Sequence, residues 1–204
     1  MVAIIDYGAG NLRSVQKALE FLGVEAEITK DRKAILTAER VILPGVGAFG
    51  DAMVRLRQSG LDDAVTSFAA SGKPLLGICL GLQLLFETSA ESPGVKGLGL
   101  FSGRIEKIPM KAGLKIPHVG WNQLEIKQPG GLLRGLGAHP YVYFVHSYYM
   151  EPLDRNLITA TTEYGAQLPV AVQKENVAAV QFHPEKSGAA GLRILKNFIE
   201  MGEK

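Results

Sequence analysis

The chain has 204 residues, of which 47% are hydrophobic and 21% charged, and its formal net charge is +2. This length suffices for an α/β domain with a buried core, and so small a charge surplus gives no electrostatic footprint for nucleic acid. One cysteine excludes an internal disulfide, and with no visible secretory leader and no apolar stretch of membrane-spanning length, we expect a cytoplasmic protein without a membrane partner.

The first half alternates short apolar runs with amphipathic stretches, which is typical of a parallel α/β sheet. Strands are predicted at residues 2–5, 25–29, 41–43 and 74–78. Helices are predicted at residues 12–22, 49–61 and 80–87. Asn11 is a candidate N-cap of the first helix, Gly23 is expected to end it, and Pro44-Gly45 is expected to end the third strand.

The second half consists mainly of shorter apolar runs separated by turns. They predict strands at residues 104–108, 123–126, 141–145, 157–162, 170–174 and 178–182, and a closing helix at 188–201. We therefore expect an α/β fold in one domain, residues 1–204. Its central, mostly parallel mixed sheet has helices on both faces, with antiparallel additions at one edge in the second half.

The strongest local signal is Gly77-Ile78-Cys79-Leu80-Gly81, at the junction of an apolar strand and a helix. This is the pattern of a nucleophile elbow, in which the glycines relieve crowding around a strained turn. The nearby helix N-terminus favours the thiolate, which is the nucleophilic form. A lone cysteine in an apolar run can equally be a small buried hydrophobic residue, so the functional interpretation needs partners.

His183-Pro184-Glu185 follows directly on a predicted strand and supplies these partners. His183 and Glu185 are two residues apart, so on extended chain they point to the same side. A carboxylate beside an imidazole orients the ring and stabilises its charged form. A solvent-facing histidine beside an incidental glutamate is the alternative.

A glycine-rich turn, residues 44–50, follows the third predicted strand and could bring backbone N–H groups to a developing oxyanion. It lacks the lysine and the spacing of a phosphate-binding loop, and Arg13 stands where a dinucleotide fingerprint needs its third glycine. No metal site is expected, because no ligand spacing connects the four histidines, His118, His139, His146 and His183.

The elbow continues through Leu82 and Gln83. Together with His183-Pro184-Glu185, it resembles the class I glutamine amidotransferases, which have one flavodoxin-like α/β domain. Further runs are similar to the members that serve as glutaminase subunits of imidazole glycerol phosphate synthase in histidine biosynthesis: residues 5–12, 44–49, 118–122, 143–148 and 181–187. The similarity spans nearly the whole chain, and the runs at 118–122 and 143–148 are the specific ones.

The resemblance implies that Cys79, His183 and Glu185 hydrolyse glutamine through a thioester, with no cofactor. It implies an oxyanion and substrate site formed by Gly45, Val46, Gly47, Leu80, Gln83, Ser147 and Tyr148. It also implies a heterodimer with a (β/α)8-barrel cyclase, which uses the ammonia to form imidazole glycerol phosphate and an aminoimidazole carboxamide ribotide. The implied interface residues are Asn11, Trp121, Tyr143 and Lys186.

Other functions remain open at this point. The chain could serve a different synthase, such as one making anthranilate, aminodeoxychorismate or a pyridoxal precursor, although residues 118–122 argue against this. It could also be a non-catalytic α/β binding module that retains an elbow cysteine, or a cysteine hydrolase. The last would leave Gln83, Ser147 and Tyr148 without a role.

Overall fold

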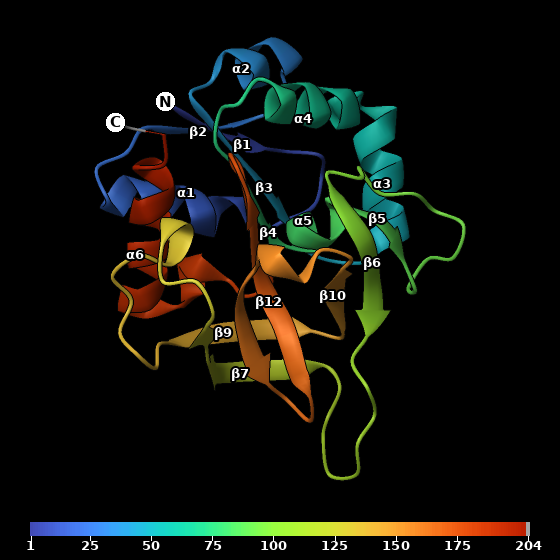
Figure 1. Cartoon of the computed structure of the whole chain (residues 1–204). Coiled ribbons are helices and arrows are strands. Elements are labelled where there is room, and N and C mark those ends of the chain that lie inside the picture. Colours follow the sequence, from blue (N-terminus) through green and yellow to red (C-terminus); the bar gives the residue numbers. More distant parts are fainter. Residues whose placement is uncertain (203–204) are drawn as a thin grey trace.

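An eight-stranded mixed sheet runs through the computed structural model, which describes residues 1–202 (Figure 1). Residues 203 and 204 of the expected domain lie outside the described part. In sheet order the strands are β2 (Ala26–Thr29), β1 (Val2–Ile5), β3 (Arg40–Gly45), β4 (Leu75–Cys79), β13 (Val177–Val180), β12 (Gln167–Lys174), β11 (Ile158–Glu163) and β8 (Glu125–Ile126). The first five are parallel and the last three antiparallel, as expected for a mostly parallel sheet with later additions at one edge.

Helices cover both faces of this sheet, because its central strands are apolar on both sides. In β1, Ala3 and Ile5 pack in one core and Val2 and Ile4 in the other. The first face carries α2 (Arg32–Thr37), α3 (Phe49–Gln58), α4 (Leu61–Ala70) and α5 (Leu80–Leu84); the second carries α1 (Leu12–Phe21) and α6 (Gly188–Ile199). The prediction of an α/β domain with helices on both faces is confirmed.

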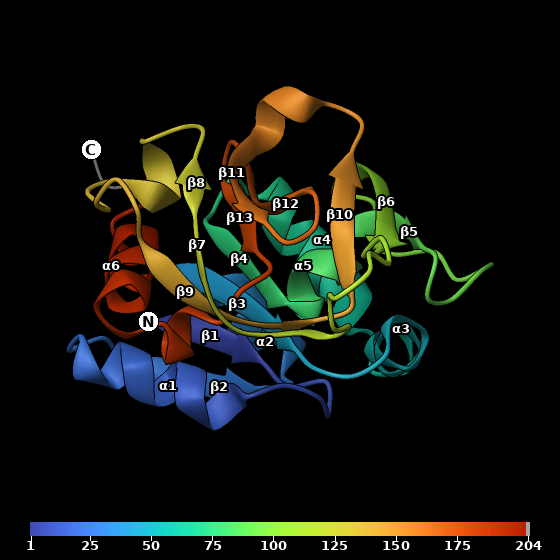
Figure 2. The ribbon, with the colours of Figure 1, turned by 90° about the horizontal axis from the view of Figure 1, so that it is seen from below.

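Two small sheets complete the domain, and here the expected edge addition is only partly correct. The three-stranded sheet has the order β10 (Tyr148–Pro152), β6 (Phe101–Lys107), β5 (Phe86–Ser89). The antiparallel ribbon of β7 (His118–Gln123) and β9 (Tyr141–His146) runs across the lower part of Figure 1, behind β12, and lies near the viewer in Figure 2. Neither sheet extends the main one, because their inner faces pack on its two cores.

Several predicted element boundaries are wrong; the strand predicted at 123–126, for example, is divided between the end of β7 and β8, and the closing helix ends at Ile199. The helix predicted at 49–61 ends at Gln58, since Gly60 adopts φ 67° and the chain then begins α4. The helix predicted at 80–87 ends at Leu84, because Phe86 pairs with Phe101 in a parallel strand and their rings stack 5.5 Å apart. Strand β3 continues through Pro44 and Gly45 instead of ending before them.

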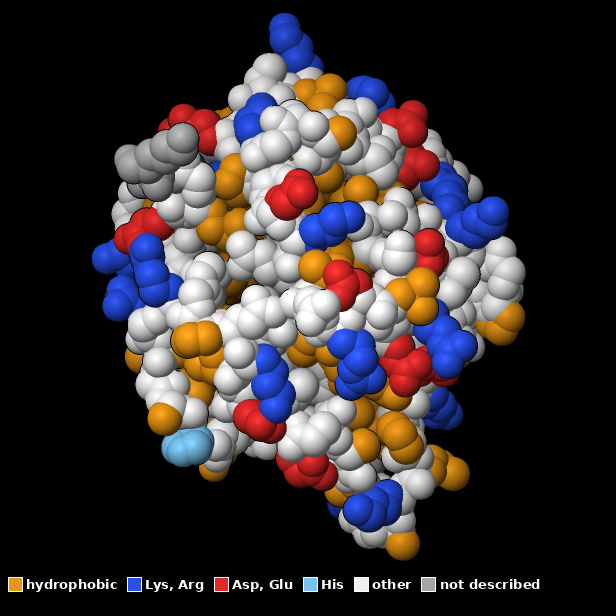
Figure 3. Space-filling view, in the orientation of Figure 1, with side chains coloured by type: hydrophobic (Ala, Val, Ile, Leu, Met, Phe, Trp, Pro, Cys, Tyr) orange, Lys and Arg blue, Asp and Glu red, His pale blue; other side chains and the backbone are white. Residues whose placement is uncertain are grey.

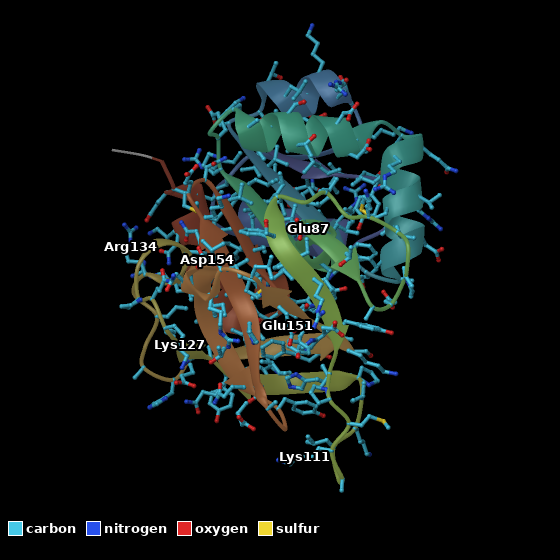
Figure 4. The ribbon with its side chains drawn as sticks, turned by 45° about the vertical axis from the view of Figure 1, so that its right-hand side comes forward. Glu87, Lys111, Lys127, Arg134, Glu151 and Asp154 are labelled. Carbon is cyan, nitrogen blue, oxygen red and sulfur yellow. The ribbon has the colours of Figure 1, made fainter. Side chains whose placement is uncertain are left out.

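The surface carries both charge signs, which alternate over the face in Figure 3. Three 3₁₀ turns, η1 (Gly131–Leu133), η2 (Arg155–Leu157) and η3 (Pro184–Lys186), connect longer elements. The loop between β6 and β7 projects from the body, with Lys111 near its tip in Figure 4. None of the helices in residues 1–202 combines the length and apolarity needed to cross a bilayer.

Candidate active site

Cys79 stands at the junction of β4 and α5 with φ 55° and ψ −112°, a conformation that costs an L-residue energy. The flanking glycines permit this turn. A Cβ on Gly77 would lie 2.9 Å from the Leu85 side chain and 3.0 Å from the Leu82 nitrogen, and one on Gly81 would overlap the Leu43 carbonyl oxygen. The predicted elbow is therefore present, and its glycines are needed because backbone passes directly beside them.

His183 follows β13, the parallel neighbour of β4, so its ring reaches the same end of the sheet as Cys79. Its Nδ1 lies 2.9 Å from Oε1 of Glu185, and both side chains are almost completely buried. Asn11, for which the family resemblance implies a place at a partner interface, donates a hydrogen bond from its amide to the same Oε1 at 3.2 Å. The carboxylate is thus held by two groups from opposite ends of the chain.

The charge state of His183 depends on this arrangement. Burial lowers its pKa, but hydrogen bonds to Cys79 and Glu185 and the negative charges of both raise it, to about 9 in total. At neutral pH the imidazole is therefore protonated beside the Cys79 sulfur. A protonated ring beside a nucleophilic sulfur can deliver a proton to a leaving group.

Cys79 and His183 open into a cavity of about 350 Å³ between the elbow and the start of β10. The predicted residues that line it are Val46, Gly47, Cys79, Leu80, Gln83, Ser147, Tyr148, His183 and Lys186. Two larger grooves, of about 610 and 590 Å³, lack both Cys79 and His183. Glu87 and Glu151, labelled in Figure 4, line the first of them.

The glycine turn lies beside the nucleophile because β3 and β4 are parallel neighbours, with Gly45 in register with Cys79. Gly45 stays outside the cavity lining; a Cβ there would lie 2.9 Å from that of Leu80, so the turn and the elbow are in contact. Gly47 has φ 102°, which favours glycine. The turn and the elbow are therefore neighbours, and Val46, Gly47 and Leu80 line the same cavity as Cys79.

Comparison with known proteins identifies the family. The family model described as glutamine amidotransferase class-I matches residues 3–201. The imidazole glycerol phosphate synthase subunit HisH of Moorella thermoacetica is 54% identical over 200 residues, covering 98% of this chain and 94% of the relative. That of Methanothermobacter thermautotrophicus is 50% identical over 201 residues, covering 98% of both. The chain belongs to the class I glutamine amidotransferases, in their HisH branch.

Solved structures agree with this assignment. A crystal structure of a glutamine amidotransferase superimposes with a TM-score of 0.77 at 25% identity, covering 98% of both chains. The structure of PurLQS from Thermotoga maritima gives a TM-score of 0.76 at 20% identity, covering 98% of this chain and 97% of that one, which shows a shared fold. The amidotransferase fold is thus retained at low sequence identity.

In this amidotransferase Gln83 lines the cavity as predicted, but its amide nitrogen is occupied by protein acceptors. It donates to the Tyr148 carbonyl at 3.4 Å and to Oε1 of Gln181 at 3.1 Å. Gln181 in turn donates to Sγ of Cys79 at 3.7 Å. The thiol also lies 3.9 Å from the Val145 carbonyl.

Sequence reasoning missed several groups at the amidotransferase's cavity. Glu91 lines it and accepts a hydrogen bond from the Phe49 nitrogen at 2.8 Å. His146 lines it from β9, and Gln181 is fully buried next to the sulfur. Gln181 could have been suspected, because it precedes His183 by two residues, whereas nothing in the sequence near Glu91 indicates a site.

The predicted interface residues of the amidotransferase divide into two groups. Trp121 and Tyr143 pair across the β7–β9 ribbon with their rings edge to face, 6.0 Å apart, and Trp121 is 56% exposed. Lys186 lies with Nζ 5.9 Å from the centre of the Tyr143 ring. Asn11 instead contacts Glu185. Within residues 1–202 no three His, Cys, Asp or Glu side chains are grouped to hold a metal.

Proposed function

We propose that this chain is the glutaminase subunit of imidazole glycerol phosphate synthase and hydrolyses L-glutamine to glutamate and ammonia at Cys79. The observation that carries the proposal is the buried row of Cys79, His183 and Glu185 at the wall of a cavity. The relatives, whose printed name is a subunit of that synthase, support the choice of pathway. The proposal takes residues 1–204 as one amidotransferase domain acting in the cytoplasm.

The reaction follows from the geometry in two halves. The Cys79 thiolate attacks the side-chain carbonyl of glutamine, and the charged His183 gives its proton to the amide nitrogen. The C–N bond breaks, ammonia leaves, and a glutamyl thioester remains on Cys79. Neutral His183 then takes a proton from water, whose oxygen attacks the thioester. The C–S bond breaks, glutamate leaves, and the thiolate and imidazolium are restored.

The oxyanion formed in each half needs hydrogen-bond donors on one side of the sulfur. The proposal assigns this role to the backbone N–H groups of Leu80 and of the Gly45–Gly47 turn, because the parallel pairing of β3 with β4 places the turn beside the elbow. Loss of one such donor typically raises the barrier by about 3 kcal/mol. The proposed oxyanion donors thus come from the elbow and from the neighbouring strand.

The substrate is assigned to the cavity wall. Gln83, Ser147 and Tyr148 line it and are proposed to contact bound glutamine. Glu91 is a carboxylate in the same wall, and its charge suits the α-ammonium group of the substrate. Both protons of the Gln83 amide nitrogen have protein acceptors, so its contact with substrate falls to the amide oxygen.

A cyclase partner explains the exposed face of the ribbon. Alternation along β7 and β9 turns the side chains of Val119, Trp121, Tyr141 and Val145 outward, and these four are 38–56% exposed. Val145 and Lys186 also line the cavity, so the face adjoins the place where ammonia is released. We assign this face to a (β/α)8-barrel cyclase, with Trp121, Tyr143 and Lys186 in contact and Asn11 acting through Glu185.

Replacement of the nucleophile tests the proposal. Glutamate release is measured for the wild-type chain and for Cys79→Ala, each mixed with the cognate cyclase subunit. Wild type is expected to be active and the variant about 10³-fold slower or worse, because no other nucleophile lies at the elbow. The control is equal binding of both chains to the cyclase. Native turnover by the variant, or an inactive wild-type complex, would refute the proposed function.

A further inference from the structure

Two histidines that the glutaminase mechanism does not use are buried beside the cavity. His118 and His146 are partners across the β7–β9 ribbon and are 3% and 5% exposed. Nδ1 of His118 lies 2.9 Å from Nε2 of His146. The His118 ring is stacked between Phe144 and Tyr164, with centroid distances of 4.7 and 3.8 Å. Both rings are therefore fixed in position.

The proton positions along this pair follow from Asn122 at one end. Oδ1 of Asn122 accepts from the Gln123 backbone nitrogen at 2.8 Å, and Nδ2 donates to the Glu163 carbonyl at 2.9 Å. These two bonds settle which amide atom is nitrogen. Since Nδ2 also faces Nε2 of His118 at 3.3 Å, that ring nitrogen must be the acceptor.

The other end is equally determined. Nδ1 of His146 lies 2.9 Å from the Tyr148 carbonyl oxygen, which can only accept. Nε2 of His146 then accepts from Nδ1–H of His118, and both rings are neutral with the proton on Nδ1. Burial lowers the pKa of each ring to about 4, so both stay neutral at physiological pH. Every hydrogen bond in the row runs from Asn122 toward Tyr148.

The row ends on the wall of the glutamine cavity. The Tyr148 carbonyl that accepts the hydrogen bond from His146 also accepts one from the Gln83 amide, at 3.4 Å. Gln83, Ser147 and Tyr148 line the cavity, and Gln83 connects through Gln181 to the Cys79 sulfur. A shift of either imidazole would therefore move the segment that faces the substrate.

We propose that His118 and His146 are positioning residues: a relay of two neutral imidazoles, anchored by Asn122, that holds the Ser147–Tyr148 segment and Gln83 in place for glutamine binding. The inference rests on the proposed function, because it names what keeps that site in shape. The relay begins on β7, the strand that presents Trp121 outward, and ends at the substrate wall. His146 lines the same cavity as His183, but none of the hydrogen bonds in the relay involves His183.

The relay predicts an effect on KM with little effect on kcat. His118→Phe keeps an aromatic ring between Phe144 and Tyr164 but removes the N–H that donates a hydrogen bond to His146. In complex with the cognate cyclase, we expect KM for glutamine to rise about tenfold and kcat to stay within about twofold. His118→Asn places an amide donor near the former Nδ1 and should bring KM back to within about threefold of wild type.

The control is His139→Phe, the same substitution at an exposed histidine in the loop before β9, for which KM should not change. A second measurement needs no variant. Nitrogen NMR of the wild-type imidazoles at pH 7 should show His118 and His146 neutral, with both protons on Nδ1. This measurement decides the question even where a substitution prevents folding.

Two results would overturn the relay: a proton on Nε2 of His146 in the wild-type chain, or a His118→Phe variant that binds the cyclase with unchanged KM. Failure of His118→Asn to restore KM in a folded complex would also count against it. An inactive wild-type complex would instead refute the glutaminase assignment. An active wild type with an unaffected His118→Phe variant would refute only the relay.

Discussion

At the residue scale, the elbow shows how one backbone constraint fixes several residue types. Cys79 keeps φ 55° only because the chain beside it has no side chains at positions 77 and 81. A Cβ on Gly81 would meet backbone of Leu43 in the neighbouring strand, which cannot rotate away as a side chain could. The glycines therefore serve packing between strands as well as the turn itself.

Gly81→Ala should consequently destabilise the whole domain. We expect a loss of about 3 kcal/mol in the free energy of unfolding, because strand β3 must move to admit the methyl group. Chemical denaturation measures this loss. Gly130→Ala is the matched control, since a Cβ there meets nothing within 4 Å and the backbone is extended. Equal stability of the two variants would show that the Gly81 contact is not rigid.

Glu185→Gln tests the electrostatics of the triad. Removal of the carboxylate charge should lower the pKa of His183 from about 9 by about one pH unit or more. NMR titration of the His183 ring in the wild type and the variant measures this. The raised pKa also stabilises the fold below pH 6.5, and this stabilisation is lost as pH rises through 9. The variant should lose less stability than the wild type between pH 6.5 and 9. An unchanged midpoint of the His183 titration would show that Glu185 does not act together with His183 and Cys79.

How far the site could be predicted differs among its residues for a physical reason. Cys79, His183 and Glu185 lie in short motifs that directly follow predicted strands. The residues within each motif already indicate their chemistry. Glu91 and Gln181 acquire their place only from packing, since the cavity brings together segments far apart in the sequence. Asn11 appears in the sequence as a helix cap, and its contact with Glu185, 174 residues away, depends on the complete fold.

At the element scale, local pattern predicted most strands but not where each helix ends. Residues 80–87 are apolar enough to continue as a helix, yet tertiary pairing of Phe86 with Phe101 ends α5 after Leu84. Strand β10 is not among the predicted strands, because its strand character comes from pairing with β6. Sequence periodicity does not contain these cross-strand contacts.

The outer face of the β7–β9 ribbon predicts a binding effect. Trp121→Ala should weaken association with the cyclase about 30-fold, because an exposed tryptophan packed on a tyrosine is a typical interface anchor. Isothermal titration or analytical centrifugation can measure the Kd. Phe21→Ala is the control, since Phe21 is 76% exposed at the far end of α1. If both variants bind like wild type, the partner does not use this ribbon.

At the scale of the whole molecule, the cavity lies where separate packing layers meet. The sheet has a core on each face, and Cys79 packs with one core while Leu80, the next residue, packs with the other. The ribbon and the three-stranded sheet close the cavity from β9 and β10. Catalytic geometry therefore requires both cores, so a defect in either reduces activity as well as stability.

Because of the buried histidines, the free energy of unfolding of the whole chain varies with pH in the acid range. The pKa values of His118 and His146 lie near 4 in the folded chain, below the ordinary value of 6.5, so the unfolded chain binds more protons between these limits. The free energy of unfolding should fall by about 1.4 kcal/mol per pH unit for each ring as pH drops from 6.5 toward 4.

Carboxylates titrate in the same range, so the informative quantity is the stability difference between wild type and His118→Asn. Denaturation at several pH values should show this difference shrinking as pH falls, because the variant has one buried imidazole fewer to protonate. If the stability difference stays constant from pH 6.5 to 4.5, the pKa of His118 is not lowered in the folded chain.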